Sequence, residues 1–221
     1  MNIVKFTFNP IQENTYIVWD DTLECIVIDA GNCSAAEDSR LTDFITEHNL
    51  KPVMAVNTHG HFDHLLGVNY LKQTFGLQFA LSSKDEYLRS MASASCAMFG
   101  LDLQVEVPQI DIDLDSVDSI TFGDTTLKVI KTPGHTPGCV SLLEEKSGNL
   151  FTGDTLFNES IGRTDLPGGD YSAIMNSIVK KLLPLGDEVV FYPGHGEKST
   201  IGHQSLYNPF IVEVLNEEVK Y

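Results

Sequence analysis

Cysteine is scarce in this chain, and the few that occur form no recognisable pair. The 221 residues include four, Cys25, Cys33, Cys96 and Cys139, at irregular spacings and without a Cys-X-X-Cys motif. Disulfide frameworks and cysteine-ligated zinc sites depend on paired or regular spacings. The pattern therefore indicates reduced thiols, most of them acting as small core residues.

Long apolar segments are also absent. No run approaches the roughly 20 residues that a membrane-spanning helix needs. The first residues, MNIVKFTFNPIQENTY, lack the basic region followed by an apolar region that is typical of a secretory leader. We therefore predict no membrane partner and a cytoplasmic location.

Positive charge is in short supply. The sequence has 14 Lys and Arg against 31 Asp and Glu, so its formal net charge is −17. Binding to nucleic acid relies on a patch of Lys and Arg facing the phosphates, and no such patch is visible in the sequence. The composition therefore predicts no nucleic-acid partner, and acidic stretches such as 111–115 are typical of a solvated surface.

The apolar pattern predicts a chain that starts with strands and then alternates helices with strands. Ser34-Ala35-Ala36-Glu37 is a capping-box sequence, which predicts a helix that starts there and ends near Asn49. An acidic extended loop is predicted over 104–120, and one or two short helices after residue 203. The predicted strands are 2–8, 15–19, 25–29, 53–57, 77–81, 120–131, 138–144, 149–152 and 188–192, and the other predicted helices are 65–75, 83–99 and 171–183.

This order of elements predicts an α/β fold. Strands followed by helix–strand alternation, with the order repeated once, indicate two β-sheets packed face to face with helices outside, which is a four-layer αββα sandwich. The chain length suits one such domain, and no low-complexity linker divides it. We therefore predict a single domain over residues 1–221.

Four predicted strands share one design at their ends. Each is an apolar run that is followed by small or turn residues and then by a side chain of the kind that binds metals. Strands of a sandwich can end at one edge, where loops on a rigid sheet often carry catalytic groups. Side chains far apart in the sequence are thus predicted to converge there. The four sequences are Ala55-Val56-Asn57-Thr58 before His59, Leu127 to Gly134 before His135, Asn149 to Gly153 before Asp154, and Val189 to Gly194 before His195.

The first of these segments is the most informative. His59 and His61 are two residues apart, so an extended backbone places them on one side, and the chain must then turn to aim Asp63 and His64. Imidazole and carboxylate ligands suit Zn, Fe or Mn. One tetrahedral ion needs only four ligands, whereas this sequence offers more, which indicates two divalent ions. The predicted metal ligands are His59, His61, Asp63, His64, His135, Asp154 and His195.

Several other residues carry open interpretations. His48 and His203 are expected to lie at helix ends rather than to bind metal. Asp29 either hydrogen-bonds a ligand histidine or simply forms a turn. Arg163 and Asp165 form a structural ion pair or contact substrate. The small residues of 90–100 form a mobile lid or allow close helix packing.

The motif His59-Gly-His61-Phe-Asp63-His64, with a later His, Asp and His, resembles the signature of the metallo-β-lactamase superfamily. The resemblance covers nearly the whole chain. It implies that His59, His61 and His135 bind one metal ion, and that Asp63, His64 and His195 bind the other. Asp154 would bridge both ions, and Asp63 and Asp154 are the expected catalytic residues.

Within that superfamily the chain resembles the glyoxalase II-like branch. The similar stretches are 132–138, 152–157 and 161–165. Antibiotic-hydrolysing lactamases lack a bridging aspartate, so Asp154 argues against them. The short segment after His195 leaves no room for the C-terminal helical domain with which glyoxalase II binds glutathione, so that domain is expected to be absent.

The resemblance implies a thioester hydrolase of the hydroxyacylglutathione hydrolase type, acting on a small molecule with a metal-bridging hydroxide. Zinc is the expected metal, with iron or manganese as alternatives. A persulfide dioxygenase that uses one iron and three protein ligands is the rival enzyme class. A non-catalytic metal-binding module is a third hypothesis.

Overall fold

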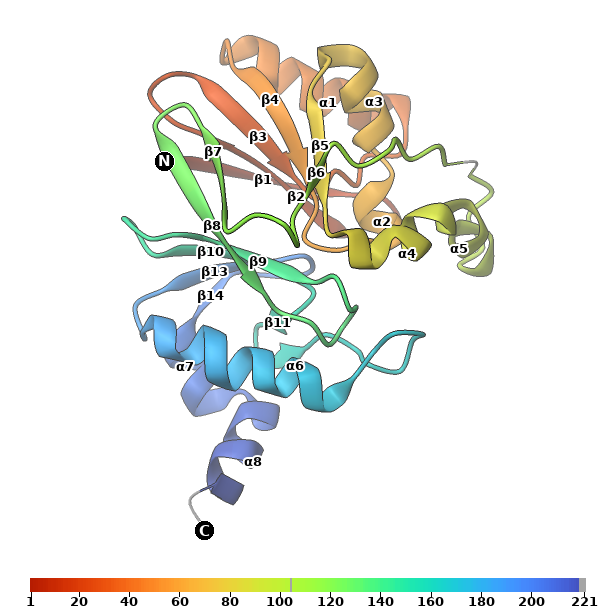
Figure 1. The fold of residues 1–221 in the computed structure, drawn as a ribbon. Helices are drawn as coiled ribbons and strands as arrows, with labels where there is room; N and C mark the ends of the chain where they lie inside the picture. The colour runs from red at the N-terminus through yellow and green to blue at the C-terminus, as the bar shows by residue number, and fades with distance from the viewer. Residues whose placement is uncertain (104, 219–221) are drawn as a thin grey trace.

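The computed structural model describes residues 1–103 and 105–218, in which two six-stranded sheets pack face to face (Figure 1). The first sheet has the order β1-β2-β3-β4-β5-β6. β1 to β3 are antiparallel, and β3 to β6 are parallel. Its strands are β1 Asn2–Phe8, β2 Glu13–Trp19, β3 Glu24–Ile28, β4 Lys51–Val56, β5 Gln78–Leu81 and β6 Ile112–Asp113.

The second sheet has the order β14-β13-β10-β9-β8-β7, and only β10 and β13 pair in parallel. A separate two-stranded hairpin, β11 with β12, follows β10. The strands are β7 Ser119–Phe122, β8 Thr125–Lys131, β9 Val140–Glu144, β10 Asn149–Gly153, β11 Leu156–Phe157, β12 Ser160–Ile161, β13 Val190–Pro193 and β14 Ser199–Thr200.

Helices cover the outer faces of both sheets (Figure 1). Those against the first sheet connect its parallel strands, and α6 to α8 lie against the second sheet. The helices are α1 Ala35–Glu47, α2 Phe62–Leu65, α3 Val68–Phe75, α4 Glu86–Ser90, α5 Ala92–Met98, α6 Tyr171–Ser177, α7 Ile201–Tyr207 and α8 Pro209–Glu218, with short helical turns at Ser83–Asp85, Ile178–Leu182 and Leu183–Leu185. Within the described residues, no helix has the length and apolar character that crossing a membrane requires.

Alternation along the strands produces the layers. In β2, Ile17 faces the helices α1 and α3, whereas Tyr16 and Val18 face the second sheet. Phe151 on β10 packs in that same central layer, while Leu150 faces α6. Because successive side chains of a strand point to opposite faces, each sheet buries both of its surfaces. The predicted four-layer αββα sandwich is confirmed.

The start of α1 differs in one detail from the predicted capping box. The Ser34 side chain accepts from the Glu37 backbone N–H, as that motif requires. The Glu37 carboxylate, however, accepts from the backbone N–H groups of Cys33 and Asn9 rather than from Ser34. It thereby attaches the β1–β2 loop to the helix.

Some predicted boundaries are wrong. The run 120–131 is a hairpin rather than one strand, because Gly123 adopts a positive φ of 49° and turns the chain between β7 and β8. The predicted helix 65–75 corresponds to α3, which starts only at Val68, whereas residue 65 ends the separate helix α2. The predicted helix 83–99 is a 3-10 turn followed by two short helices. Residues 105–120 are mostly irregular but include β6 and the start of β7, and residue 104 lies outside the described residues.

Candidate metal centre

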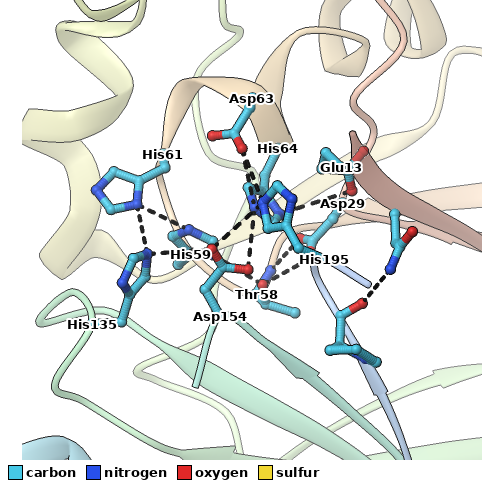
Figure 2. A network of polar contacts seen from close by, with 12 residues as sticks. Glu13, Asp29, Thr58, His59, His61, Asp63, His64, His135, Asp154 and His195 are labelled. Carbon is cyan, nitrogen blue, oxygen red and sulfur yellow. Dashed lines mark hydrogen bonds and ion pairs between the residues drawn. The ribbon is translucent and has the colours of Figure 1, made fainter. Parts of the chain in front are cut away.

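All seven predicted ligands converge at one edge of the sandwich (Figure 2). β4 of the first sheet leads into the segment that carries His59 to His64. β8, β10 and β13 of the second sheet lead to His135, Asp154 and His195. α2 supplies the turn that aims Asp63 and His64, since both lie within it. The predicted convergence of the four strand ends is therefore observed.

Three histidines form a first group. The His61 Nδ1 atom lies 3.1 Å from His59 Nε2 and 2.8 Å from His135 Nε2. Nitrogen ligands about 2.0–2.1 Å from a tetrahedral zinc ion lie roughly 3.3 Å from one another. The spacing of these three nitrogens fits one metal ion, with His61 using the opposite ring nitrogen from its two partners.

Asp63, His64 and His195 form a second group. The Asp63 Oδ2 atom lies 3.2 Å from His195 Nε2 and 3.6 Å from His64 Nε2. One ligand atom from each residue lies within 4.8 Å of the others, as in the first group. These separations suit a second cation bound beside the first.

Asp154 lies between the two groups. Its Oδ2 atom is 3.6 Å from His135 Nε2 in the first group and 3.6 Å from His195 Nε2 in the second. Its Oδ1 atom is 3.5 Å from His64 Nε2, and neither of these two atoms has a hydrogen-bond partner among the described residues, although both are buried. Buried polar atoms are normally satisfied. The residues therefore fit a pair of metal ions for which Asp154 is a shared ligand.

The comparisons with known proteins agree with this geometry. Residues 8–195 match the family model described as the metallo-beta-lactamase superfamily. The chain belongs to this superfamily. Its fold and its cluster of histidine and aspartate side chains at the strand ends are those of a metal-binding protein of that family.

Two relatives within the superfamily have different activities. A Haemophilus influenzae protein named hydroxyacylglutathione hydrolase GloC is 35% identical, over 96% of this chain and 98% of its own length. The human mitochondrial persulfide dioxygenase ETHE1 is 29% identical, over 99% of this chain and 79% of its own length. The 35% identical relative supports the assignment made by the family model, and the names of the two relatives describe two different reactions.

Two solved structures match the chain closely in fold. One is described as the BLEG-1 B3 metallo-beta-lactamase, with a TM-score of 0.87, 35% identity and coverage of 95% of this chain and 99% of that one. The other is TTHA1623 in a di-iron-bound form, with a TM-score of 0.83, 31% identity and coverage of 94% and 99%.

Most ligand rings are oriented by a partner on the side away from the metal position. His135 Nδ1 lies 2.8 Å from the Arg163 carbonyl oxygen, and His195 Nδ1 lies 3.2 Å from that of Gln12. A ring that donates N–H from Nδ1 to a carbonyl leaves the Nε2 lone pair free for a metal. Backbone carbonyls thus select the tautomer that binds metal.

Asp29 is held at the end of β3 with a positive φ of 53°. Its carboxylate accepts from the Thr58 N–H and hydroxyl, both at 2.7 Å, and lies 3.2 Å from His64 Nδ1. Asp29 therefore forms the bend after β3 and lies beside His64, although His64 Nδ1 has no hydrogen-bond partner among the described residues.

The two groups differ in their affinity for protons. Burial lowers the pKa of His59, and the neighbouring histidines lower it further. Burial and His135 lower the pKa of His61 to about 4. These rings are therefore neutral near pH 7, which is the form of imidazole that binds metal.

In the second group the carboxylates reverse that tendency. Burial lowers the pKa of His64, but Asp63, Asp154 and Asp29 outweigh it and raise the pKa above the ordinary value. Burial lowers the pKa of His195, but Asp63 and Asp154 together outweigh burial and raise it above the ordinary value. Burial raises the pKa of the Asp63 carboxyl, but the neighbouring His64 and His195 lower it by more. The pKa of Asp63 therefore lies well below its ordinary value, and Asp63 is ionised.

Sequence reasoning missed two buried carboxylates beside the ligands. Glu13 is fully buried, and its Oε1 atom lies 3.9 Å from His64 Nδ1. Asp85 is also fully buried and accepts hydrogen bonds from two ligand-bearing loops. The available signal for Glu13 was an acidic residue at the start of a strand that is otherwise apolar; Asp85 had no comparable signal.

The remaining interpretations concern residues around the site. Arg163 and Asp165 form a doubly hydrogen-bonded, exposed ion pair, with both contacts at 2.7 Å. Ala92 and Cys96 of α5 pack against Phe62, which supports close packing as the role of the small residues in 90–100. His48 is the C-cap residue of α1, His203 lies in the first turn of α7, and the four cysteines are free, as predicted.

Proposed function

We propose that this superfamily member is a hydrolase that uses two divalent metal ions to cleave thioesters of the hydroxyacylglutathione type. The observation that carries the proposal is the position of Asp154, whose carboxylate faces histidines of both ligand groups. A site for a single ion has no need of a carboxylate between two groups. The 35% identical hydrolase supports the same reaction type.

The proposed ligands divide between the two positions. His59, His61 and His135 would hold the first ion, and Asp63, His64 and His195 the second, with Asp154 shared. When bound, two such ions supply a water of lowered pKa and a Lewis acid for the substrate carbonyl. We propose zinc because it prefers imidazole and carboxylate ligands, with iron or manganese as alternatives. The similar structure in a di-iron-bound form favours iron over manganese among these alternatives.

The chain's own residues would hold the ions, and none of the residues assigned to them would donate a proton to the leaving group. Asp63 is ionised, and its Oδ2 atom lies 3.2 Å from His195 Nε2, so both atoms would face the second ion. A thiol with a pKa of about 8.5 leaves as thiolate without a strong acid. The proposed thioester substrate therefore suits a site in which all seven histidines and aspartates of the two groups are assigned to metal binding.

A second candidate function is favoured by the human relative. Persulfide dioxygenase activity would need one iron, and the first group offers three histidines for it. The complete second group favours hydrolysis over this alternative. A non-catalytic metal-binding role is the least favoured, because all seven ligand types are present.

Metal quantitation followed by a substrate panel tests the proposal. The protein is purified without chelators, its zinc, iron and manganese are measured, and it is assayed with S-lactoylglutathione, other thioesters, lactones and a β-lactam. Two ions per chain with thioester turnover is the expected result. One iron with oxygen uptake on glutathione persulfide would establish the dioxygenase instead, and turnover of the β-lactam alone would establish a lactamase.

We also propose that residues 1–221 form one domain and that the protein acts in the cytoplasm. The central apolar layer contains side chains from both sheets, which supports a single folding unit. Cooperative unfolding in one transition tests the first statement, and cell fractionation tests the second.

A further inference from the structure

Asp85 joins two loops that are distant in the sequence. It ends the helical turn Ser83–Asp85, and its side chain is fully buried. Its Oδ2 atom accepts from the Gly60 N–H at 2.9 Å and from the Thr136 hydroxyl at 2.6 Å, and its Oδ1 atom accepts from the Gly138 N–H at 2.8 Å. One carboxylate thus holds the loop after β4 and the loop after β8.

Both loops approach the carboxylate too closely for a side chain of their own. A Cβ atom on Gly60 would lie 2.8 Å from Asp85 Cβ, and one on Gly138 would lie 2.5 Å from Asp85 Cγ. Contacts this short require something to shift. Glycine at both positions is what allows the backbone N–H groups to reach the carboxylate.

These loops carry two ligands of the first group. Gly60 lies between His59 and His61, and Thr136 follows His135 directly. Among the residues that the structure describes, the His61 ring has no hydrogen-bond partner beyond His59 and His135. The position of His61 therefore depends on its backbone, which Asp85 attaches to the loop that carries His135.

We propose that Asp85 is a positioning residue that sets the spacing of His61 and His135 and thereby the metal affinity of the first position. This inference rests on the proposed two-ion centre. Among the described residues, the carboxylate of Asp85 makes no contact with the second group. Its loss should therefore weaken binding of one ion and leave the other bound.

Asparagine cannot replace Asp85, although it has nearly the same shape. Each carboxylate oxygen accepts from a different backbone N–H, on Gly60 and on Gly138. An amide NH2 would have to face one of these N–H groups, which places two donors together. Asp85→Asn therefore breaks the link between the loops with almost no change in side-chain volume.

Asp20 provides a matched control. It is a buried carboxylate that also connects two loops, accepting from Thr22 on one side and from Asp124 and Thr125 on the other. It contacts none of the seven ligands, so Asp20→Asn removes a comparable structural link away from the metals.

Competition titration with a chromophoric zinc chelator tests the proposal on the whole protein. We expect two zinc ions per wild-type chain, and a fall of about 10–100-fold in one affinity for Asp85→Asn, as for the loss of other outer partners of metal ligands. In a His61→Ala background, which removes the first position, Asp85→Asn should not change the remaining affinity. Asp20→Asn should lower the melting temperature and change neither affinity.

Three results would overturn the inference. Unchanged affinities in Asp85→Asn would do so, and so would equal weakening of both ions, because that indicates a merely structural role. Wild-type protein that binds no zinc, iron or manganese would overturn the proposed function as well. If Asp85→Asn does not fold, Thr136→Val removes one of the three bonds and should weaken the same ion by a smaller factor; no change there would also refute the inference.

Discussion

The two halves of the candidate metal centre use similar ligands in different surroundings. The first group, His59, His61 and His135, consists of imidazoles alone, and its outer partners are the Arg163 carbonyl, a threonine hydroxyl and backbone held by Asp85. The second group contains Asp63, and His64 lies against two further carboxylates, Glu13 and Asp29. The first half therefore offers imidazoles alone, whereas the second includes the ionised carboxylate of Asp63. Burial raises the pKa of Glu13 well above its ordinary value, so that residue does not add to the negative charge.

This difference predicts different roles for the two ions. Three imidazole ligands leave the charge of an ion largely intact, whereas the ionised Asp63 offsets part of it. The first ion should therefore be the stronger Lewis acid. The second position should bind a metal cation more firmly than the first. In the metal-free protein, the second position should also bind protons more firmly than the first.

The largest effect is expected from Asp154→Ala, since its carboxylate lies between histidines of both halves. The variant should lose thioesterase activity by more than the roughly 100-fold that the loss of an outer partner costs, and both ions should bind more weakly. Metal analysis and steady-state kinetics measure the two effects. Two firmly bound ions in Asp154→Ala would show that the halves are independent.

Asp29→Asn should weaken the second ion by about 10–100-fold and the first ion much less. Its oxygen can still accept from the Thr58 N–H, but its NH2 group would face His64 Nδ1, which Asp29 Oδ2 now approaches to 3.2 Å. The same chelator titration measures this. Equal weakening of both ions would contradict the proposed division of the site.

The metal affinities should depend on pH to different extents. In the metal-free protein near pH 6, His61, with a pKa of about 4, is neutral, whereas His64 and His195 have pKa values raised above 6.5 and hold protons. Metal must displace those protons. Affinity for the second ion should therefore rise more steeply between about pH 6 and pH 8. If the affinities for the two ions change with pH by the same slope, the proposed difference between the two positions is wrong.

The smallest effect is expected from Arg163→Ala. The side chains of Arg163 and Asp165 are 53% and 69% exposed, and exposed pairs contribute only about 0–1 kcal/mol. The bond to His135 uses the Arg163 backbone and survives the substitution. Thermal unfolding should be nearly unchanged. A raised KM at unchanged kcat would establish that this guanidinium contacts substrate.

The fold and the convergence of the seven candidate ligands were predictable because each has a local sequence signal. An apolar strand followed by glycine and then histidine, as before His135 and His195, is visible within a few residues. The hairpin turn at Gly123 was missed because an alternating pattern continues on both sides of it. Glycine alone is a weak signal within such a pattern.

The outer carboxylates were not predictable in the same way. Glu13 and Asp85 have partners 25 or more residues away, and most of Asp85's partners are backbone N–H groups that every sequence has. Only the folded chain brings them together. The residues that surround the ligands, and that distinguish the two halves of the site, therefore come together only in the tertiary structure.

Beside His195, residues 12–16 contact residues 193–195. Asn14 donates its backbone N–H to the Gly194 carbonyl, Tyr16 donates its hydroxyl to the Pro193 carbonyl, and Gln12 lies against the His195 ring. The partners in these contacts are separated by nearly the whole sequence. During synthesis, a ribosome must therefore release almost the entire chain before the last ligand reaches its place. The proposed second metal position is thus completed only after residue 195 has been synthesised, so we expect its ion to bind after that point.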